Sequence, residues 1–207
     1  MKEYPNNIRK AIPLFFRPPI EYEELEYYGT LYLLRRDILT CLGTNPNTGK
    51  PFEHGCKATW SAIMGILAGI DLLGKFMKGE GADVGLSKTK FMAYLERYFE
   101  LDSEEDREIL YQLRCSVLHS FGWYSVVKAT KREYRFQLSG LKNALLIEKT
   151  SDAKNRDVYV IGLQALYEQF EESICAYSHD LVANETLLAN FDKIFPDYGW
   201  MRIGPPQ

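Results

Sequence analysis

Apolar residues recur at helical spacing along most of the chain, and turn-forming residues interrupt them at several points. This pattern predicts three helices in the first half of the sequence, at residues 21–42, 58–77 and 87–99. A fourth helix is expected to begin at Ser103, because Asp106 three residues later completes a pattern typical of a capping box.

The fourth helix is apolar on two sides. Leu110, Leu113 and Val117 form one stripe, which we expect to face the core, and the helix should end near Gly122. A second stripe consists of Tyr111, Cys115 and Leu118. Because the first stripe already serves the core, we expect the second to pack against a partner, and a symmetric homodimer is the commonest way to cover it.

The pattern changes from helical spacing to alternation after this helix. Tyr134 and Phe136 alternate with polar residues, which is the period of a half-buried strand. Residues 145–149 and 158–161 predict two further strands with turn residues between them. We therefore expect a small antiparallel β-meander over residues 133–162.

These elements together predict a mainly α fold of the α+β class, with a single domain over residues 1–207. Its helical core, residues 21–125, is expected to be a four-helix bundle, and the helical period returns in a closing helix over residues 163–191. Residues 1–20 are expected to form an extended arm, because four prolines rule out a long helix there.

Composition and charge limit the function classes. Hydrophobic residues make up 46% and charged residues 26% of the chain, which is typical of folded domains. The net charge of −3 means that any contact with a polyanion must come from a local basic cluster. Four widely separated cysteines without a secretion signal predict a cytoplasmic protein. The longest apolar stretch, residues 62–73, is too short to span a membrane, so no membrane contact is expected.

Arg114 and His119 are the most informative polar residues of the fourth helix. A guanidinium suits phosphate, and an imidazole suits proton transfer near neutral pH. His119 lies in the last turn, where the helix dipole favours the imidazolium form. On a regular helix the two residues project about 140° apart, so we expect them to work together in a cleft shared by two chains. A structural helix cap is the alternative interpretation of His119.

Four residues are candidates for supporting roles. Asp71 falls within the apolar stripe of the second helix, where a carboxylate is unfavourable unless it is paired. Lys75, one turn later, is within reach to pair with it. Asp71 is therefore either a structural partner of Lys75 or an acid near the active groups. Ser116 and Ser120 are candidates to supply hydroxyl groups to the site.

Candidate RNA-binding residues follow the fourth helix. Lys128, Lys131 and Arg132 form the most basic run of the chain, where an RNA backbone would pass. Trp123 and Tyr124 are candidates to stack on an unpaired base. A solvated turn for the basic run, and core packing for the two aromatic residues, are the alternatives.

Metal and cofactor signals in the sequence are weak. His54 and Cys56, with Cys41 upstream, are fewer ligands than a structural zinc site uses. No phosphate-binding glycine loop or dinucleotide fingerprint occurs in the sequence. We therefore predict no metal and no cofactor.

The Arg-x4-His motif at the end of a long helix, followed by Gly122 and aromatic residues, resembles that of the HEPN family. The resemblance covers residues 21–125. It implies a four-helix core, a homodimer that brings two motifs together, and metal-independent endoribonuclease activity. Arg114 would then stabilise the scissile phosphate, and His119 would act as general acid and base in the attack of the 2′-hydroxyl. The resemblance also implies RNA as substrate and a cognate antitoxin protein as partner of a toxin.

Two positions depart from the family pattern. Cys115 follows the arginine where members often have a polar residue, commonly Asn. Phe121 stands where some antitoxin-paired members have the tyrosine that is modified, so modification at that position is not expected. The leading hypothesis is an RNA-cleaving or RNA-binding homodimer. The alternative is a catalytically inactive HEPN-like helical interaction module.

Overall fold

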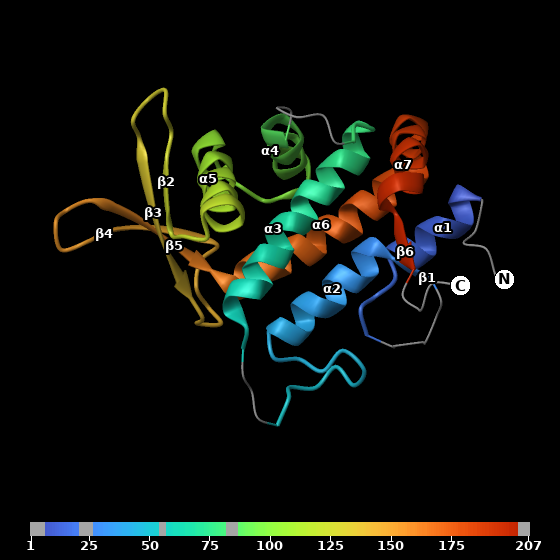
Figure 1. The fold of residues 1–207 in the computed structure, drawn as a ribbon, viewed down its shortest axis with the longest axis horizontal. Coiled ribbons are helices and arrows are strands. Elements are labelled where there is room, and N and C mark those ends of the chain that lie inside the picture. The colour runs from blue at the N-terminus through green and yellow to red at the C-terminus, as the bar shows by residue number, and fades with distance from the viewer. Residues whose placement is uncertain (1–6, 21–26, 54–56, 82–86, 203–207) are drawn as a thin grey trace. The chain divides into compact units, whose positions relative to one another are not determined.

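The computed structural model describes residues 7–20, 27–53, 57–81 and 87–202, and within them it has an α+β fold. Helices dominate, and the strands form one sheet of four strands and one of two. The elements are α1 (Ile8–Phe15), β1 (Tyr27–Gly29), α2 (Thr30–Cys41), α3 (Thr59–Lys78), α4 (Ser87–Tyr98), α5 (Glu104–Ser120), β2 (Tyr124–Val126), β3 (Glu133–Ser139), β4 (Ile147–Ser151), β5 (Asp157–Gly162), α6 (Leu163–Ala183), α7 (Glu185–Tyr198) and β6 (Trp200–Arg202) (Figure 1).

The contacts within the chain group it into two compact units. The terminal unit comprises residues 1–84 and 176–207, and the central unit comprises residues 85–175. Helix α6 contributes its first part to the central unit and its last part to the terminal unit. The expectation of a single domain stays a prediction.

Aromatic rings form the core of the terminal unit. The Phe15 ring lies 4.8 Å from that of Phe76 and 5.2 Å from that of Phe191, measured between centroids. Phe15 belongs to α1, so the expectation of an extended arm over residues 1–20 is wrong for this segment. Pro13 lies inside α1, but in so short a helix it removes few hydrogen bonds, and the buried apolar face of the helix outweighs that loss.

The second element of the terminal unit also differs from its prediction. Helix α2 begins at Thr30, and the three residues before it form β1 instead of helix. Strand β1 pairs antiparallel with β6, with Tyr28 opposite Met201 (Figure 1). Gly29 ends β1 close to α1, where a Cβ atom would lie 2.8 Å from the Phe15 Cα, so only glycine fits there. Residues 21–26 of the predicted helix lie outside the described residues.

Helix α3 confirms the predicted second helix to within a residue at each end. Gly79 ends it in the left-handed conformation, with φ of 66°. The helix is long and apolar enough to cross a membrane by length and composition, with a mean hydropathy of 1.4 in its most apolar window. However, 61% of that window is buried within the protein, and a buried core helix can have the same length and hydropathy. These values are therefore weak evidence for a membrane span.

Two helices replace the predicted closing helix over residues 163–191. Asn184 separates α6 from α7, and its side-chain oxygen accepts hydrogen bonds from the backbone N–H groups of Thr186 and Leu187. An asparagine that caps a new helix competes with continuation of the old one, and the hydrophobic period does not reveal this break.

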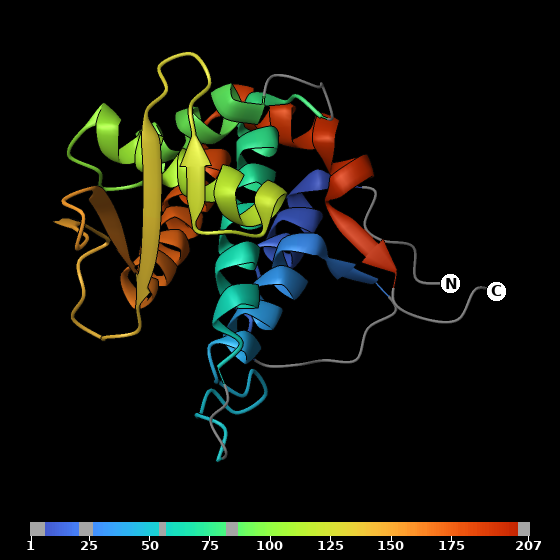
Figure 2. The same cartoon turned by 60° about the vertical axis from the view of Figure 1, so that its left-hand side comes forward.

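The central unit contains the four-stranded sheet, in the order β2-β3-β5-β4. Figure 2 shows its long strand β3 beside β2, with which it pairs antiparallel. Strand β3 pairs parallel with β5, so the expected antiparallel meander is wrong and the sheet is mixed. Strand β5 is largely buried and takes a central place, whereas β4 is mostly exposed and lies at the edge.

The predicted start and core stripe of α5 are confirmed. The Ser103 hydroxyl accepts a hydrogen bond from the backbone N–H of Asp106, at 3.1 Å. Leu110, Leu113 and Val117 are completely buried. One stripe of α5 therefore packs in the core. The candidate site is formed by side chains outside that stripe.

Candidate functional site

Arg114 and His119 contact each other within one chain. The Arg114 Nη1 atom lies 2.5 Å from His119 Nε2. Arg114 is 9% exposed, whereas His119 is exposed at the end of α5. The two side chains therefore meet within one chain despite their angular separation on the helix, and a cleft shared by two chains stays a prediction. Their Cα–Cβ bonds point in different directions, but the arginine side chain is long enough to span the difference.

The contact sets the form of the imidazole in this arrangement. A guanidinium has only N–H donors, so Nε2 of His119 must accept, and the ring proton then lies on Nδ1. The neutral imidazole is the form that can take a proton. A cation and a base are thus side by side at the surface of α5.

Ser116 fixes the backbone that follows this pair. The N–H groups of Phe121 and Gly122 both point to the Ser116 carbonyl oxygen, and the Ser116 hydroxyl donates to the carbonyl of Gly122. Ser116 is 1% exposed. Its hydroxyl therefore holds the end of α5 in place. In this structure the Ser116 hydroxyl positions the backbone after the helix, whereas the sequence led us to expect that it supplies a hydroxyl group to the site. Ser120 is exposed at the last helical residue.

Phe121 adopts an unusual backbone conformation at this helix end. Its φ is 47°, in the left-handed region, although its side chain is 68% exposed. Such a backbone costs an L-residue roughly 1–2 kcal/mol. Gly122, which could adopt it at no cost, has no positive φ. The sequence thus places the glycine one residue after the position that favours it.

The second stripe of α5 is half-buried within the chain. The Tyr111 ring packs edge-on against Phe91 of α4, with centroids 5.8 Å apart, and Lys88 Nζ lies 5.1 Å from its centre. Cys115 and Leu118 are also half-buried. The expectation of a stripe left uncovered by the monomer is therefore correct only in part.

A polar chain that the sequence did not reveal links α4, α5 and β2. Lys88 pairs with Glu108 at 2.7 Å, and Glu108 accepts from Gln112 at 2.9 Å. Gln112 in turn accepts from the Ser125 hydroxyl at 2.6 Å. Because Gln112 is buried, these bonds satisfy its amide and fix β2 against the helix that carries Arg114.

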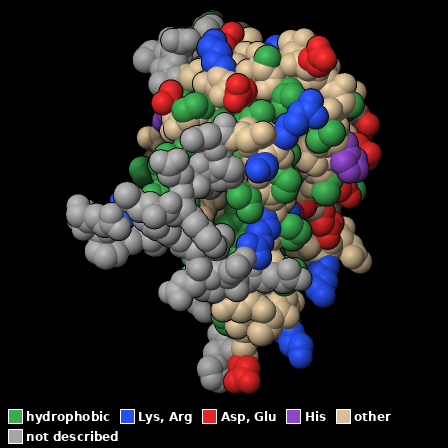
Figure 3. Space-filling view, turned by 90° about the vertical axis from the view of Figure 1, so that its right-hand side faces the viewer, with side chains coloured by type: hydrophobic (Ala, Val, Ile, Leu, Met, Phe, Trp, Pro, Cys, Tyr) green, Lys and Arg blue, Asp and Glu red, His purple; other side chains and the backbone are tan. Residues whose placement is uncertain are grey.

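Basic residues gather in the part of the sequence that contains the site. Residues 114–156 include nine Lys and Arg but only three Asp and Glu, although the whole chain has a net charge of −3. Lys128 and Lys131 are exposed on the turn between β2 and β3. On the face drawn in Figure 3, by contrast, the coloured acidic, basic and apolar side chains are interspersed.

Arg132 is held by its own unit. It pairs with Glu105, donates to the Tyr159 hydroxyl at 3.0 Å and lies 5.0 Å over the centre of the Tyr134 ring. The hydrogen bond that Arg132 donates to Glu105, followed by the one that it donates to Tyr159, raises the pKa of Arg132 above its ordinary value. All three cations of the predicted RNA-binding run are exposed, but Arg132 is paired and anchors the turn to α5.

The two predicted stacking residues differ in exposure. Trp123 is half-buried, whereas Tyr124 is 45% exposed on β2 with Arg135 5.3 Å over its ring centre. A hydrogen bond with Glu133 is the main cause that raises the pKa of Tyr124. The Arg135 guanidinium is the main cause that lowers the pKa of Glu133.

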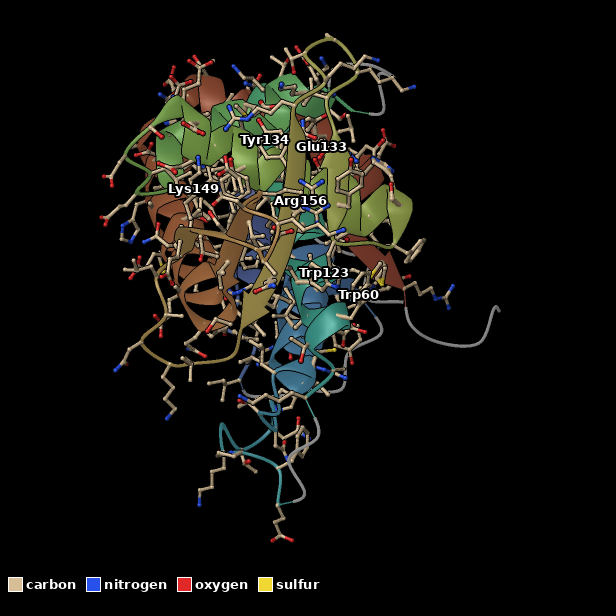
Figure 4. All side chains as sticks on the ribbon, turned by 90° about the vertical axis from the view of Figure 1, so that its left-hand side faces the viewer. Trp60, Trp123, Glu133, Tyr134, Lys149 and Arg156 are labelled. Carbon is tan, nitrogen blue, oxygen red and sulfur yellow. The ribbon has the colours of Figure 1, made fainter. Side chains whose placement is uncertain are left out.

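A second ion pair lies near this cluster. Arg156 Nη2 is 2.6 Å from Asp152, and its hydrogen bonds lower the pKa of Asp152 to about 2. The charge of Arg156 also contributes to lowering the pKa of Glu133 (both residues are labelled in Figure 4). Glu133 and Arg135 therefore form an ion pair on β3 beside Tyr124, and Asp152 and Arg156 form one in the turn between β4 and β5.

Asp71 and Lys75 belong to the terminal unit. Asp71 is half-buried on α3, and Lys75 Nζ lies 4.9 Å over the centre of the Tyr198 ring. Arg114 and His119 belong to the central unit. The proposed supporting role of Asp71 and Lys75 stays a prediction.

The described residues offer little for a metal. Among residues 7–20, 27–53, 57–81 and 87–202, no group of three His, Cys, Asp or Glu side chains could hold one. The faint zinc candidates His54 and Cys56 lie outside those ranges. Among the described residues, Cys41, Cys115 and Cys175 are thiols and not disulfides. Burial, followed by the charge of Asp37, raises the pKa of Cys41.

Comparisons with protein-family models, with curated proteins and with solved structures found no match to this chain.

Proposed function

We propose that this protein is a metal-independent endoribonuclease with a HEPN-like helical core, and that it cleaves RNA at Arg114 and His119. The contact of 2.5 Å between Arg114 Nη1 and His119 Nε2 is the observation that carries the proposal. It puts a permanent cation and a proton acceptor within reach of a single phosphodiester group. The exposure of His119 gives an RNA strand access to them.

The residues suggest a reaction in two proton transfers. RNA phosphate binds the Arg114 guanidinium in place of His119, which releases Nε2 to take the proton of the adjacent 2′-hydroxyl. The 2′-oxygen then attacks phosphorus, and Arg114 stabilises the charge that develops on the phosphate oxygens. The bond to the 5′-oxygen breaks, and that oxygen takes up the proton that His119 Nε2 now carries, which returns the imidazole to its neutral form. The products are a 2′,3′-cyclic phosphate and a 5′-hydroxyl end.

The test is cleavage of RNA by the purified protein in the presence of EDTA. We expect products with 2′,3′-cyclic phosphate ends, because the mechanism uses only this chain's side chains. Arg114→Lys should lose most of the activity, since a lysine cannot make the two parallel contacts of a guanidinium with phosphate. Activity that disappears in EDTA and returns with Mg²⁺ or Mn²⁺ would contradict the proposal.

The inactive interaction module remains the competing function, and one observation favours it. Arg114 is mostly buried, and a buried arginine that holds His119 also serves as a structural tie. An absence of RNA cleavage by wild-type protein, with a loss of thermal stability in Arg114→Lys, would support that function instead.

We propose a homodimer as a separate feature of the protein. The half-buried Cys115 and Leu118 leave part of the second stripe of α5 for a partner chain. Leu118→Glu should shift a dimer to monomer in light scattering. Since Arg114 and His119 already meet within one chain, a monomeric Leu118→Glu variant that stays active would show that the site needs no second chain. A cognate antitoxin is a further proposed partner, and co-purification from a native host would reveal it.

A further inference from the structure

Phe121 has no evident structural reason to be phenylalanine. Its ring is 68% exposed, and its backbone is left-handed, with φ of 47°. Asparagine or glycine would suit this backbone better, and an exposed polar residue would suit the surface better. A residue that is unfavourable on both grounds points to a function for its side chain.

The backbone around Phe121 is fixed rather than loose. Its N–H and that of Gly122 bond to the carbonyl of Ser116, and the buried Ser116 hydroxyl bonds back to Gly122. The aromatic ring is therefore presented from a defined position two residues after His119. A fixed and exposed aromatic ring loses little conformational entropy when a flat ligand stacks on it.

The chain around this ring favours a polyanion with flat groups. Residues 114–156 carry nine basic and three acidic residues, with Lys128 and Lys131 exposed. A second exposed aromatic residue, Tyr124, follows three positions later. Cations with interspersed aromatic rings are the combination that binds single-stranded nucleic acid, in which phosphates meet the charges and unpaired bases stack on the rings.

We propose that Phe121 is the stacking platform for an unpaired base next to the scissile phosphate, so that the substrate is single-stranded RNA. This inference rests on the proposed ribonuclease function. It makes Phe121 a residue that contacts substrate and orients it over Arg114 and His119. Because every base has a flat face, the platform gives little base preference and discriminates against duplex RNA, whose bases are already stacked.

The experiment measures binding apart from cleavage. The probe is a short 2′-fluoro RNA strand, which lacks the attacking 2′-hydroxyl and so cannot be cleaved. It contains 2-aminopurine, a base whose fluorescence reports stacking. Wild type, Phe121→Asn and Phe121→Tyr are compared. Asparagine tolerates the left-handed backbone without a ring, whereas tyrosine keeps both the ring and the strain. Gly122→Ala is the matched control, because a Cβ atom there meets nothing closer than the Ser120 carbonyl at 3.7 Å.

We expect Phe121→Asn to weaken binding roughly five- to 150-fold, the effect of losing one base–aromatic stack, and to abolish the change in fluorescence. Phe121→Tyr and Gly122→Ala should bind as wild type does. The melting temperature of Phe121→Asn should equal or exceed that of wild type, so that a loss of binding is not a loss of fold. A duplex probe should bind more weakly than the single strand.

The outcomes separate the two proposals. Unchanged binding by Phe121→Asn, in a protein that cleaves RNA, overturns the stacking platform and leaves the ribonuclease intact. A wild-type protein that binds no single-stranded probe overturns both. A change of oligomeric state in Phe121→Asn, without a change in RNA affinity, would assign the ring to a protein interface and also overturn the platform.

Discussion

Helices α3 and α5 are long helices of similar length that bury very different side chains. The ten buried residues of α3 are all apolar or glycine. Of the seven buried residues of α5, three are polar, namely Gln112, Arg114 and Ser116. Burial of apolar area alone accounts for α3, whereas each buried polar group of α5 needs a partner. Those partners are His119, Ser125, Glu108 and the Gly122 carbonyl, and together they build the candidate site.

The largest expected effect comes from removing His119, the exposed member of the Arg114–His119 pair in α5. His119→Ala should lower the rate of RNA cleavage by about 10²–10⁴-fold, because a positioned general base contributes that much. His179→Ala, which removes an exposed histidine of α6, is the matched control and should leave the rate unchanged. Single-turnover cleavage and circular dichroism check rate and fold. Full activity in His119→Ala would exclude this chemistry.

The next largest effect is expected on stability, from removing a buried aromatic ring of α3. Phe76 is fully buried, with its ring 4.6 Å from that of Phe191 between centroids. Phe76→Ala should lower the free energy of unfolding by about 3–5 kcal/mol through lost burial and a cavity. Lys78→Ala, at the exposed end of the same helix, should change it by less than about 0.5 kcal/mol. Urea unfolding measures both, and equal effects would contradict the placement of the core.

A smaller effect tests whether the polar groups of α5 depend on one another. Gln112→Leu should cost about 1–3 kcal/mol, because it leaves the partly buried Ser125 hydroxyl without its acceptor. The double variant Gln112→Leu/Ser125→Ala should recover part of this loss, since both partners are then apolar. Additive costs in the double-mutant cycle would mean that the two side chains do not interact.

The smallest effect contrasts this buried network with an exposed pair. The pKa of Asp152 is about 2, so its favourable pairing with Arg156 is present above the ordinary pKa of aspartate and is lost as pH falls through about 2. Arg156→Gln should return the pKa of Asp152 toward its ordinary value in an NMR titration. Stability at neutral pH should hardly change, because exposed ion pairs contribute little. A large loss of stability would show that the pair is not exposed.

Local sequence patterns predicted those parts of the fold that local interactions determine. Ser103 marks the start of α5, Gly79 the end of α3, and the alternation around Phe136 marks β3. The pairing of β1 with β6 joins residues far apart in sequence, and neither short strand has a hydrophobic period of its own. The parallel pairing of β3 with β5 likewise depends on which strand is buried in the sheet. The alternation of apolar and polar residues does not predict this.

The candidate site was predicted by residue type but not by geometry. Arg114 and His119 were recognisable as a chemical pair, whereas helical angles placed them on different faces. Side-chain length decided the contact, and helical periodicity does not contain that information. The role of Ser116 and the left-handed backbone of Phe121 were also beyond reach, because the sequence offers a glycine at the next position.

The pairing of β1 with β6 has a consequence for the order of events during synthesis. Strand β1 leaves the ribosome early, but its partner, Trp200–Arg202, is made last among the described residues. At ~5–20 residues per second, the first strand waits on the order of ten seconds or more for the second. The central unit meanwhile has all the strands of its own sheet. The nascent chain should therefore acquire protease resistance first in its middle, and only afterwards at its two ends.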